Sequence, residues 1–455
     1  MKNILLKKLL LLAGDAVLVV AAFYFAPVLR FGNLLEFAAV FETVDVASIF
    51  SYLFVFYLFD LYTLEEKFSS GAYIIRFGIA LIIANVFIAV IFFLFHISLY
   101  SLGIFFIISS LIFFFCMGWR LIYETTLVRA RRPLRLAIIG AGKAGQAFYN
   151  MVKKRKDYEV IGFLDDDEKK WGQSMGSASV LGGSEGLFDL VRERKIDKVI
   201  VAITRTIRPE MYKKLIEAKF SGVNVYEMPT YYEMLTGKIP VRHVSDLWLT
   251  HSTMSGVRRS TYTLRVKRVI DIFLSLCGLI VTSPFMALIW VAIRLDTPGP
   301  ALFIQKRIGW QARPFNLHKF RTMRQGSENE REHAGHRNDP RITGVGKVLR
   351  LFRLDELPQL WNVLKGDMSF IGPRALMEEE VREFNPAIPY FGLRHAVRPG
   401  ITGWAQVNYP HGATKEDALE KLQYDLYYLK NMSFLLDLHI LLRTVRVVVF
   451  GKGAR

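Results

Sequence analysis

Cysteine is scarce in this sequence, with only Cys116 and Cys277 among 455 residues. Both lie inside apolar runs, so the sequence offers no disulfide framework and no cluster of thiolates for a metal. Acidic residues are also few relative to basic ones: 41 Asp and Glu stand against 59 Lys and Arg, which gives a formal net charge of +18. A chain this basic requires an anionic partner to be considered, and nucleic acid is the first candidate.

Apolar residues, in contrast, are abundant and concentrated in a few runs. They make up 52% of the chain, and Phe alone occurs 35 times, more than one soluble core needs. This pattern predicts a membrane protein, with the lipid bilayer as a partner. Basic residues that flank membrane spans are an ordinary topology signal and contact anionic lipid, so we favour this origin of the charge and expect no nucleic-acid partner.

Residues 1–125 are predicted to form a membrane α-helical bundle of four spans. The apolar runs are each near the length that crosses a bilayer; they cover residues 9–28, 46–59, 77–95 and 102–119. Basic residues collect on the side that we expect to face the cytoplasm, namely Lys2, Lys7, Lys8, Lys67, Arg76, Arg120, Arg129, Arg131, Arg132 and Arg135. Asp15 lies inside the first run. It could be a functional intramembrane residue, but we favour a structural interpretation, either as part of a buried pair or at a snorkelling position near the interface.

Residues 133–240 change to an alternation of short apolar strands and helices, which predicts an α/β domain of Rossmann-like type with a parallel, doubly wound sheet. The first strand is followed by Gly140, Gly142 and Gly145 in a G-x-G-x-x-G pattern and then by a helix. Asp165 follows the second strand, 20 positions after the last glycine, where a ribose-binding carboxylate would lie. A nucleotide site at these four residues is one interpretation, and glycines kept for packing alone are the other, which we favour.

A fifth apolar run, residues 270–293, is interrupted at Ser283 and Pro284. A proline inside a helix removes a backbone donor, and a neighbouring serine can bond to the carbonyl that is left free. Basic residues lie on both sides of the run, as at a cytoplasmic surface: Arg265, Lys267 and Arg268 precede it, and Arg294, Lys306, Arg307, Arg313 and Lys319 follow it. We therefore predict a re-entrant membrane helix over residues 266–294 that breaks at Ser283–Pro284; a kinked spanning helix is the alternative. Residues 240–262 are predicted to be a linker or surface segment.

Two adjacent carboxylates, Asp355 and Glu356, precede an apolar helical pattern of Leu357, Leu360 and Leu364. They should lie at or near the start of a helix, where free N–H groups and a partial positive charge favour an ionised carboxylate and a bound phosphate. Neighbours on a helix diverge by about 100°, so the two groups should do different jobs. An ordinary charge pair at a solvated helix end is the alternative interpretation.

The chain around this pair is rich in basic residues, which suit a polyanionic phosphate substrate. Guanidinium groups bind phosphate bidentately, and Mg²⁺ bridges acids to phosphates. The basic residues include Lys319, Arg321, Arg350, Arg353, Arg374, Arg394 and Arg398. A basic face that lies on anionic lipid headgroups is the alternative.

From about Lys267 to the C-terminus the chain resembles the bacterial sugar transferases, the monotopic polyprenyl-phosphate phosphoglycosyl transferases. The matching motifs are Lys267-Arg268 with Asp271, the Ser283-Pro284 break, Pro298-Gly299-Pro300, Lys319 to Met323, Leu354 to Leu360, Gly366 to Arg374 and Arg398 to Val407. The layout of four spans and a Rossmann-like domain before the transferase is similar to the long members that load galactose or glucose phosphate. Ala375 departs from the pattern, since many members have a second proline there.

The resemblance implies an enzyme of the bacterial inner membrane, with its active site facing the cytoplasm, that starts exopolysaccharide, O-antigen or capsule assembly. It would transfer a sugar 1-phosphate from a UDP-sugar to undecaprenyl phosphate and release UMP, with Mg²⁺ as cofactor. Residues 260–455 would form a helix-rich catalytic domain. Asp355 would be the nucleophile and carry a covalent phospho-sugar intermediate, since a carboxylate can attack phosphorus to form an acyl phosphate. The resemblance leaves open whether the chain forms a homodimer.

Roles follow for the other residues of this domain. We assign Glu356 to Mg²⁺ or to proton handling at the acceptor phosphate. The expected metal ligands are Asp355 and Glu356, with Asp367 as a weaker candidate for the metal or for helix capping. The residues expected to bind substrate phosphates are Lys319, Arg321, Arg353, Arg374 and Arg398.

Two functions of other classes compete with this one. A membrane-anchored nucleotide-sugar dehydratase or epimerase would share the spans and the Rossmann-like domain, but it needs a Tyr-x-x-x-Lys pair beyond the glycine loop. The match, Tyr149 and Lys153, lies on the helix that the loop opens, where it cannot face a nicotinamide ring. A non-enzymatic nucleotide-sensing scaffold would leave the motifs after Gly299 without a purpose.

Overall fold

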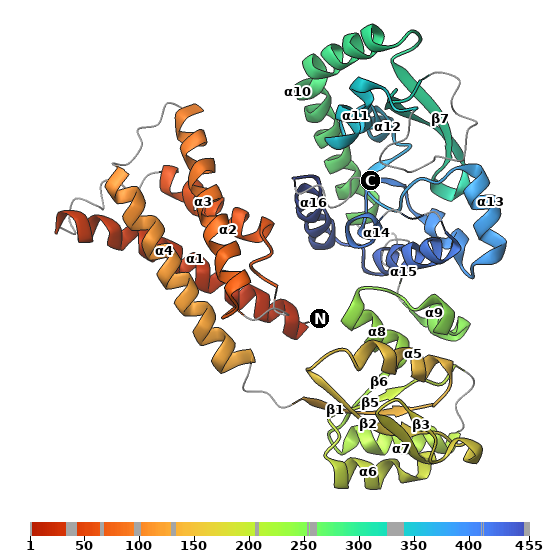
Figure 1. Ribbon diagram of the computed structural model, residues 1–455. Coiled ribbons are helices and arrows are strands. Elements are labelled where there is room, and N and C mark those ends of the chain that lie inside the picture. The colour runs from red at the N-terminus through yellow and green to blue at the C-terminus, as the bar shows by residue number, and fades with distance from the viewer. Residues whose placement is uncertain are drawn as a thin grey trace. The chain divides into compact units, whose positions relative to one another are not determined.

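The computed structural model describes residues 2–32, 43–63, 68–94, 102–128, 133–204, 209–252, 254, 262–324, 341–410, 412 and 414–449. The backbone separates into two compact units, Met1–Pro133 and Leu134–Arg455. Figure 1 shows the first unit in red to orange and the second in yellow to blue.

The described residues of the first unit form α-helices at the positions of the four predicted apolar runs. They are α1 (Lys2–Phe31), α2 (Thr43–Leu58), α3 (Gly71–Leu94) and α4 (Leu102–Tyr123), and a π-helical turn η1 (Glu124–Val128) extends α4. By length and composition, α1, α3 and α4 are each able to cross a membrane. α2 has 16 residues, about 24 Å at 1.5 Å per residue, which is short for a hydrocarbon core of about 30 Å. The apolar helices support the predicted membrane protein.

Asp15 on α1 is fully buried and forms an ion pair with Arg120 on α4. Two guanidinium nitrogens of Arg120 donate to the carboxylate at 2.5 and 2.7 Å, and its Nε donates to the Tyr73 hydroxyl on α3 at 2.9 Å. The same guanidinium lies 4.9 Å from the centroid of the Phe77 ring. Each charge therefore has partners in surroundings that would penalise an isolated ion. The interpretation of Asp15 as part of a buried pair is confirmed.

A six-stranded sheet forms the centre of the α/β part of the second unit, in the order β3-β4-β2-β1-β5-β6. Its strands are β1 (Leu134–Ile139), β2 (Tyr158–Leu164), β3 (Ser174–Met175), β4 (Ala178–Gly182), β5 (Lys198–Val201) and β6 (Asn224–Glu227). Neighbouring strands pair in parallel, except that β3 and β4 are antiparallel. The predicted alternation of strands and helices is present as a mixed sheet in an α/β domain.

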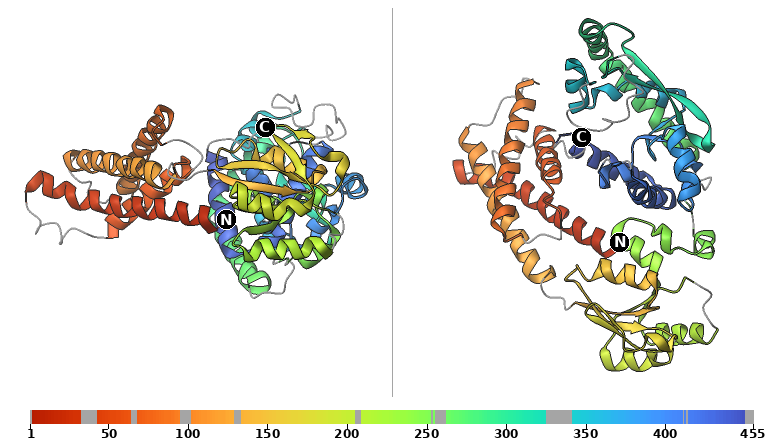
Figure 2. Two further views of the ribbon diagram at one scale, coloured as in Figure 1. Left: turned by 90° about the horizontal axis from the view of Figure 1, so that it is seen from below. Right: turned by 45° about the vertical axis from the view of Figure 1, so that its right-hand side comes forward.

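Helices cover both faces of this sheet (Figure 2). They are α5 (Lys143–Val152) and α8 (Met228–Thr236) on one face, and α6 (Leu187–Arg194) and α7 (Pro209–Phe220) on the other. Alternate side chains of a strand point to opposite faces, so Leu136 and Ile138 pack with the first pair of helices, and Ala137 and Ile139 with the second. The uninterrupted apolar run of β1 follows from burial on both of its faces.

The glycine loop between β1 and α5 is shaped by its own packing. Gly140 has φ +101°, and a Cβ on Gly145 would lie 2.0 Å from the Gly140 carbonyl oxygen. Asp165 accepts hydrogen bonds from the Ala141 backbone N–H at 2.7 Å and from the Lys170 ammonium at 3.0 Å. The carboxylate that would hold a ribose thus already binds the loop and a lysine, which favours the packing interpretation.

Gly142 and Gly145 provide a matched test of that loop. A Cβ at Gly142 would meet no atom within 4 Å, whereas a Cβ at Gly145 would collide with backbone. We expect Gly145→Ala to lower the free energy of unfolding by about 1–3 kcal/mol, the usual range for overpacking, and Gly142→Ala to leave it nearly unchanged. Thermal unfolding of both variants measures this, and equal losses for the two would contradict the packing role.

Residues 237–251 pack against the C-terminal part of the second unit. They contain the short helices η4 (Val241–His243) and α9 (Asp246–His251). Ile239, Val241 and Trp248 are buried in one cluster with Phe384 and Leu422, and the Ile239 N–H donates to the Gln423 carbonyl at 3.0 Å. The prediction of a linker or surface segment is therefore wrong for this stretch, because its apolar side chains complete a core.

This packing moves the N-terminal boundary at which the C-terminal domain can be truncated. A chain that begins at Ser260 lacks the side chains of Ile239, Val241 and Trp248, each of which stabilises by about 1.5–3 kcal/mol when fully buried. We expect a chain beginning at Gly237 to unfold at a clearly higher temperature in detergent than a chain beginning at Ser260, and to retain more of the activity that the resemblance implies. Equal melting temperatures and activities for the two would contradict this boundary.

The remainder of the second unit is rich in short helices. After η5 (Tyr262–Val266), its longer elements are α10 (Lys267–Asp296), β7 (Leu302–Ile308), β8 (Pro314–Phe320), α11 (Gly344–Leu351), α12 (Gln359–Lys365), β9 (Ser369–Ile371), α13 (Glu378–Ala387), β10 (Gly400–Thr402), α14 (Trp404–Asn408), α15 (Lys415–Asn431) and α16 (Phe434–Val449). β7 and β8 form an antiparallel hairpin, and β9 pairs with β10 in parallel.

α10 is one continuous helix of 30 residues with Pro284 inside it. The prediction of a helical break at Ser283–Pro284 is wrong in this respect, although Figure 1 shows that the ribbon of α10 bends along its course. Pro284 cannot donate to the Ile280 carbonyl, and the Ser283 hydroxyl donates to that carbonyl instead, at 2.9 Å. The predicted serine rescue is confirmed, and it explains how the helix continues.

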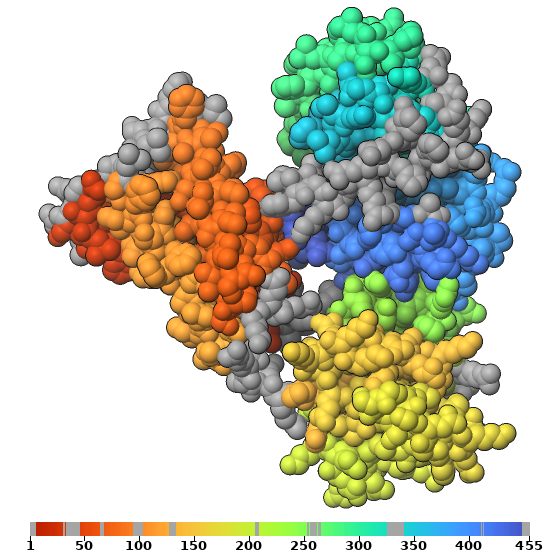
Figure 3. Space-filling view, in the orientation of Figure 1, coloured from red at the N-terminus to blue at the C-terminus, as the bar shows by residue number. Residues whose placement is uncertain are grey.

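The apolar surface of α10 is largely uncovered by protein. Only 6% of its apolar window is buried, against 28–33% for α1, α3 and α4; it contributes to the green surface at the top of Figure 3. Near its start, Asp271 accepts from the Phe370 N–H at 3.0 Å, and Arg268 donates to the carbonyls of Val363 and Leu364 at 2.6 and 2.7 Å. An apolar helix that suits lipid is thereby fixed to the end of α12.

Candidate active site

Asp355 and Glu356 lie in a 3₁₀ turn, η9 (Leu354–Glu356), between α11 and α12. They lie near the start of a helix, as predicted, but before it, because α12 begins at Gln359 and has seven residues. Pro358 offers no N–H to continue an α-helical ladder from the turn. Arg353 before the turn has φ +57°, a left-handed conformation that few non-glycine residues adopt.

Asp355 is an unusually placed carboxylate. It is 9% exposed, and its Oδ1 has no hydrogen-bond partner among the described residues. Burial raises the pKa of Asp355, the charge of Glu356 raises it further, and Lys319, Arg350 and Arg353 oppose both effects. Such a group, poorly solvated and surrounded by cations, is suited to attack an electrophile that brings its own negative charge.

Glu356 is held among cations from two elements. Its Oε1 lies 3.4 Å from the Arg353 Nη1 and 3.7 Å from Nζ of Lys319 on β8. Burial lowers the pKa of Lys319, while the Glu356 carboxylate raises it. The structure thus brings together four residues that the sequence predicts for the site: Asp355, Glu356, Lys319 and Arg353.

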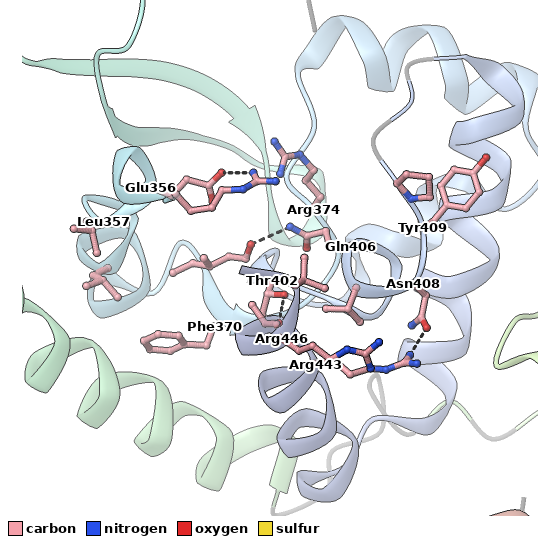
Figure 4. Close-up of a pocket in the computed structure, with 17 residues that line it drawn as sticks. Glu356, Leu357, Phe370, Arg374, Thr402, Gln406, Asn408, Tyr409, Arg443 and Arg446 are labelled. Atoms are coloured by element: carbon pink, nitrogen blue, oxygen red, sulfur yellow. Dashed lines mark hydrogen bonds and ion pairs between the residues drawn. The ribbon is translucent and has the colours of Figure 1, made fainter. Parts of the chain in front are cut away.

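A pocket of about 410 Å³ opens beside this cluster. Glu356 and Arg374 line it at one side (Figure 4), and Arg353 is also a lining residue. Leu357, Leu360 and Phe370 add apolar surface. A Cβ on Gly278 of α10 would lie 3.2 Å from the Leu360 side chain, so the apolar part of the pocket continues toward the exposed helix. The pocket combines a charged end with an apolar wall.

Three predicted site residues lie elsewhere. The Arg321 guanidinium donates to the carbonyls of Pro298 and Thr297 at 2.9 and 2.8 Å, and Arg398 donates to the Gly366 carbonyl at 2.9 Å. Asp367 follows α12 at its C-terminal end and pairs with Lys365 at 3.2 Å. None of the three is among the described residues that line the pocket, and the same is true of Asp355 and Lys319, which lie next to its lining residue Glu356.

Other pocket residues lie outside the sequence prediction. α16 supplies Arg443, Thr444, Arg446 and Val447, and the stretch from α14 onward supplies Gln406 to Pro410. α16 follows the last recognisable motif. The signal that it does carry is a pair of arginines three positions apart on a largely apolar helix, which places them on one face.

No three of the described His, Cys, Asp and Glu side chains gather as a metal site. Asp355 and Glu356 are adjacent without Asp367, which fits a site of one or two carboxylates. That donor set suits Mg²⁺, which usually keeps water ligands and binds substrate phosphates at its other positions. Among the residues that the structure describes, none bonds to the Asp355 Oδ1, which is in keeping with such a role.

Comparison with known proteins agrees with this geometry. A family model described as bacterial sugar transferase matches residues 262–451, and one described as CoA-binding domain matches residues 57–229. The chain is 39% identical to the UDP-N-acetylgalactosamine-undecaprenyl-phosphate N-acetylgalactosaminephosphotransferase of Aeromonas hydrophila, over 54% of this chain and 57% of that protein. It thus spans little more than half the length of this relative.

Two further relatives are matched over more of their length. The UDP-glucose:undecaprenyl-phosphate glucose-1-phosphate transferase of Escherichia coli (strain K12) is 33% identical, over 70% of this chain and 68% of that protein. The exopolysaccharide production protein PSS of Rhizobium leguminosarum bv. phaseoli is 42% identical, over 42% of this chain and 98% of that protein.

The described apolar helices are those of a membrane-associated protein, and its second unit holds a buried carboxylate among cations. The chain belongs to the bacterial sugar transferase family.

Proposed function

We propose that this chain transfers a sugar 1-phosphate from a UDP-sugar to undecaprenyl phosphate and releases UMP. The observation that carries the proposal is the Asp355 carboxylate, buried and without a hydrogen-bond partner at Oδ1 among the described residues. Lys319, Arg350 and Arg353 stabilise its charge. The names of the relatives in Aeromonas and Escherichia describe the same class of reaction.

The reaction divides into two displacements at one phosphorus atom. In the first, an Asp355 oxygen attacks the sugar-bearing phosphorus, the bond from that phosphorus to the bridging oxygen breaks, and UMP leaves with the electron pair. In the second, an oxygen of undecaprenyl phosphate attacks the same phosphorus and the Asp355 carboxylate is released. Arg353, Arg374 and Lys319 bind the phosphate oxygens and offset the repulsion between anions.

Mg²⁺ fits this scheme as a cofactor held by Asp355 and Glu356, where it would neutralise charge on the diphosphate. Glu356 also orients Arg353 and Lys319 through its ion pairs. The sugar is left open, since the named relatives act on different UDP-sugars.

Each domain has a different role in this proposal. Residues 1–125 anchor the chain in the bacterial inner membrane, and residues 133–240 form a Rossmann-like domain without a part in the chemistry. The catalytic domain, set at 260–455 by the sequence, gains residues 237–251 because they complete its core. A dehydratase or epimerase is not favoured, since the Tyr149 hydroxyl is bonded to Ser177 at 2.8 Å and Tyr149 is buried.

A direct assay tests the function. Purified protein in detergent or nanodiscs is incubated with Mg²⁺, undecaprenyl phosphate and each of a panel of UDP-sugars, and UMP release is measured. We expect release with at least one UDP-sugar and dependence on the lipid acceptor for continued turnover. Absence of UMP release across the panel, with protein that remains folded, would overturn the proposal.

The proposal also places the active site on the cytoplasmic side, where UDP-sugars are found, with α10 as a re-entrant helix. Basic residues flank α10 at both ends, including Lys267, Arg268 and Arg294. We expect reporters fused after Arg135 and after Arg455 to be cytoplasmic. A C-terminal reporter outside the cytoplasm would show that α10 crosses the membrane and would contradict the re-entrant helix.

A further inference from the structure

The C-terminal helix α16 brings two guanidinium groups to the active-site pocket. Arg443 and Arg446 both line it, and Figure 4 shows them on the side away from Glu356 and Arg374. The pocket therefore has a basic group at each of two separated places. The two-step reaction proposed above gives a role only to the place beside Glu356 and Arg374.

The charge of the pocket lining is unbalanced. Among the described residues that line it, Glu356 is the acid, whereas four are arginines: Arg353, Arg374, Arg443 and Arg446. Arginines that are gathered in a partly apolar pocket repel one another, and a bound anion relieves that repulsion. A phosphate beside Glu356 would use Arg353 and Arg374, and a second anion could use Arg443 and Arg446.

Arg443 is held in position from two sides. One of its nitrogens donates to the Asn408 side-chain oxygen, and its guanidinium lies 5.4 Å from the centroid of the Trp404 ring. Trp404 is itself fixed, since it stacks on Tyr427 at 5.7 Å and its Nε1 donates to the Gly237 carbonyl at 2.8 Å. A guanidinium that is held in this way loses little conformational freedom when it binds an oxyanion.

Hydroxyl groups lie next to the same place. Thr402 of β10 and Thr444 of α16 both line the pocket, and their hydroxyls are 2.7 Å apart. The Thr444 hydroxyl donates to the Ile440 carbonyl at 2.8 Å, so the Thr402 hydroxyl donates to Thr444 and both protons are used within the protein. On the α16 side of the pocket, the donors for an anionic ligand are therefore the guanidinium groups of Arg443 and Arg446.

We propose that Arg443 and Arg446 form a second phosphate-binding subsite in the active-site pocket, so that the C-terminal helix is a substrate-binding element. The inference rests on the proposed function, in which two phosphate groups other than the transferred one take part. These are the phosphate of the UMP leaving group and the phosphate of the lipid acceptor. The shared chemistry is a phosphate group with a mono- or dianionic charge.

The test compares Arg443→Gln/Arg446→Gln with the native full-length chain. Steady-state kinetics are measured while the UDP-sugar and undecaprenyl phosphate are varied in turn. We expect KM for one of the two substrates to rise about 10- to 100-fold, the range for losing charge-assisted hydrogen bonds. A rise for the UDP-sugar assigns the subsite to the nucleotide phosphate, and a rise for the lipid assigns it to the acceptor.

Two controls separate this effect from lost charge or lost folding. Arg382→Gln removes a cation from the exposed face of α13, where Arg382 pairs with Glu378, and it should leave both KM values unchanged. Arg443→Lys/Arg446→Lys keeps the charge and removes the planar fork, so it should show a smaller rise than the glutamine variant. The lysine variant also serves if the glutamine variant does not fold.

Binding is measured separately from turnover. Thermal shifts with UMP and with a short-chain polyprenyl phosphate should be smaller in the Arg443/Arg446 variants for the same ligand whose KM rises. The proposal is overturned if both KM values stay within about twofold of native in a folded variant, or if activity falls only with melting temperature while ligand shifts are unchanged. If the native chain binds these ligands through Arg443 and Arg446 but releases no UMP, the subsite stands and the proposed function fails.

Discussion

Asp355→Asn should leave a folded protein that releases UMP at least about 10³-fold more slowly than the native chain. The substitution keeps the size and shape of the side chain but removes the negative charge that attacks phosphorus. No other described carboxylate shares the position of Asp355, because Glu356 faces Arg353 and Lys319. The matched control is Asp189→Asn on the exposed surface of α6, which makes the same change away from the pocket.

The stability of this variant should move in the opposite direction to its activity. The pKa of folded Asp355 is raised above the ordinary value, mainly by burial. The folded state therefore holds the proton more tightly than the unfolded state, and the stability that this contributes is lost as pH rises through the raised pKa. Asparagine stays neutral, so above that pH the variant should melt at the same temperature as the native chain or higher.

Intact mass spectrometry tests the covalent step directly. The native chain is incubated with the UDP-sugar and Mg²⁺ without lipid acceptor, and we expect one sugar-phosphate adduct on Asp355 with one equivalent of UMP. Asp355→Asn should form no adduct. Ternary-complex kinetics without an adduct, or full activity in Asp355→Asn, would leave direct in-line transfer as the mechanism.

The parts of the fold that depend on local pattern were predictable. Apolar runs place α1 to α4 and α10 where the structure has them, and the Ile280 carbonyl freed by Pro284 is bonded by Ser283. Asp355, Glu356 and Lys319 come together because β8 runs beside the turn that holds the acids. In each case the information lies in residue order or in one well-spaced motif.

The parts that depend on tertiary partners were not predictable. Arg321 lies in a basic motif typical of phosphate binding, yet it donates to the carbonyls of Thr297 and Pro298. Sequence composition does not reveal which arginine will satisfy a buried backbone carbonyl and which will face solvent. Arg443 reaches the pocket because α16 folds back on Trp404, a contact that no local periodicity encodes.

Glu356→Gln should lower kcat by about 10²- to 10³-fold, the range for a group that handles a proton or orients charge at the reacting centre. It also provides a second, independent readout. The charge of Glu356 is the second cause, after burial, that raises the pKa of Asp355. Glutamine removes that charge, so the pKa of Asp355 should fall in the variant.

The pH dependence of adduct formation measures this shift. Attack requires ionised Asp355, so the rate rises with pH through the pKa of that group, and the acid limb of the variant should lie at lower pH than the native limb. Glu378→Gln on α13, an exposed glutamate paired with Arg382, is the control that should leave the limb unmoved.

The same variant separates the two roles assigned to Glu356. If Glu356 acts only at the acceptor phosphate, the variant still forms the adduct at a near-native rate and loses the second step. If it holds Mg²⁺, adduct formation slows and responds to added Mg²⁺. An acid limb that does not move in a folded Glu356→Gln variant would contradict the electrostatic coupling between the two carboxylates.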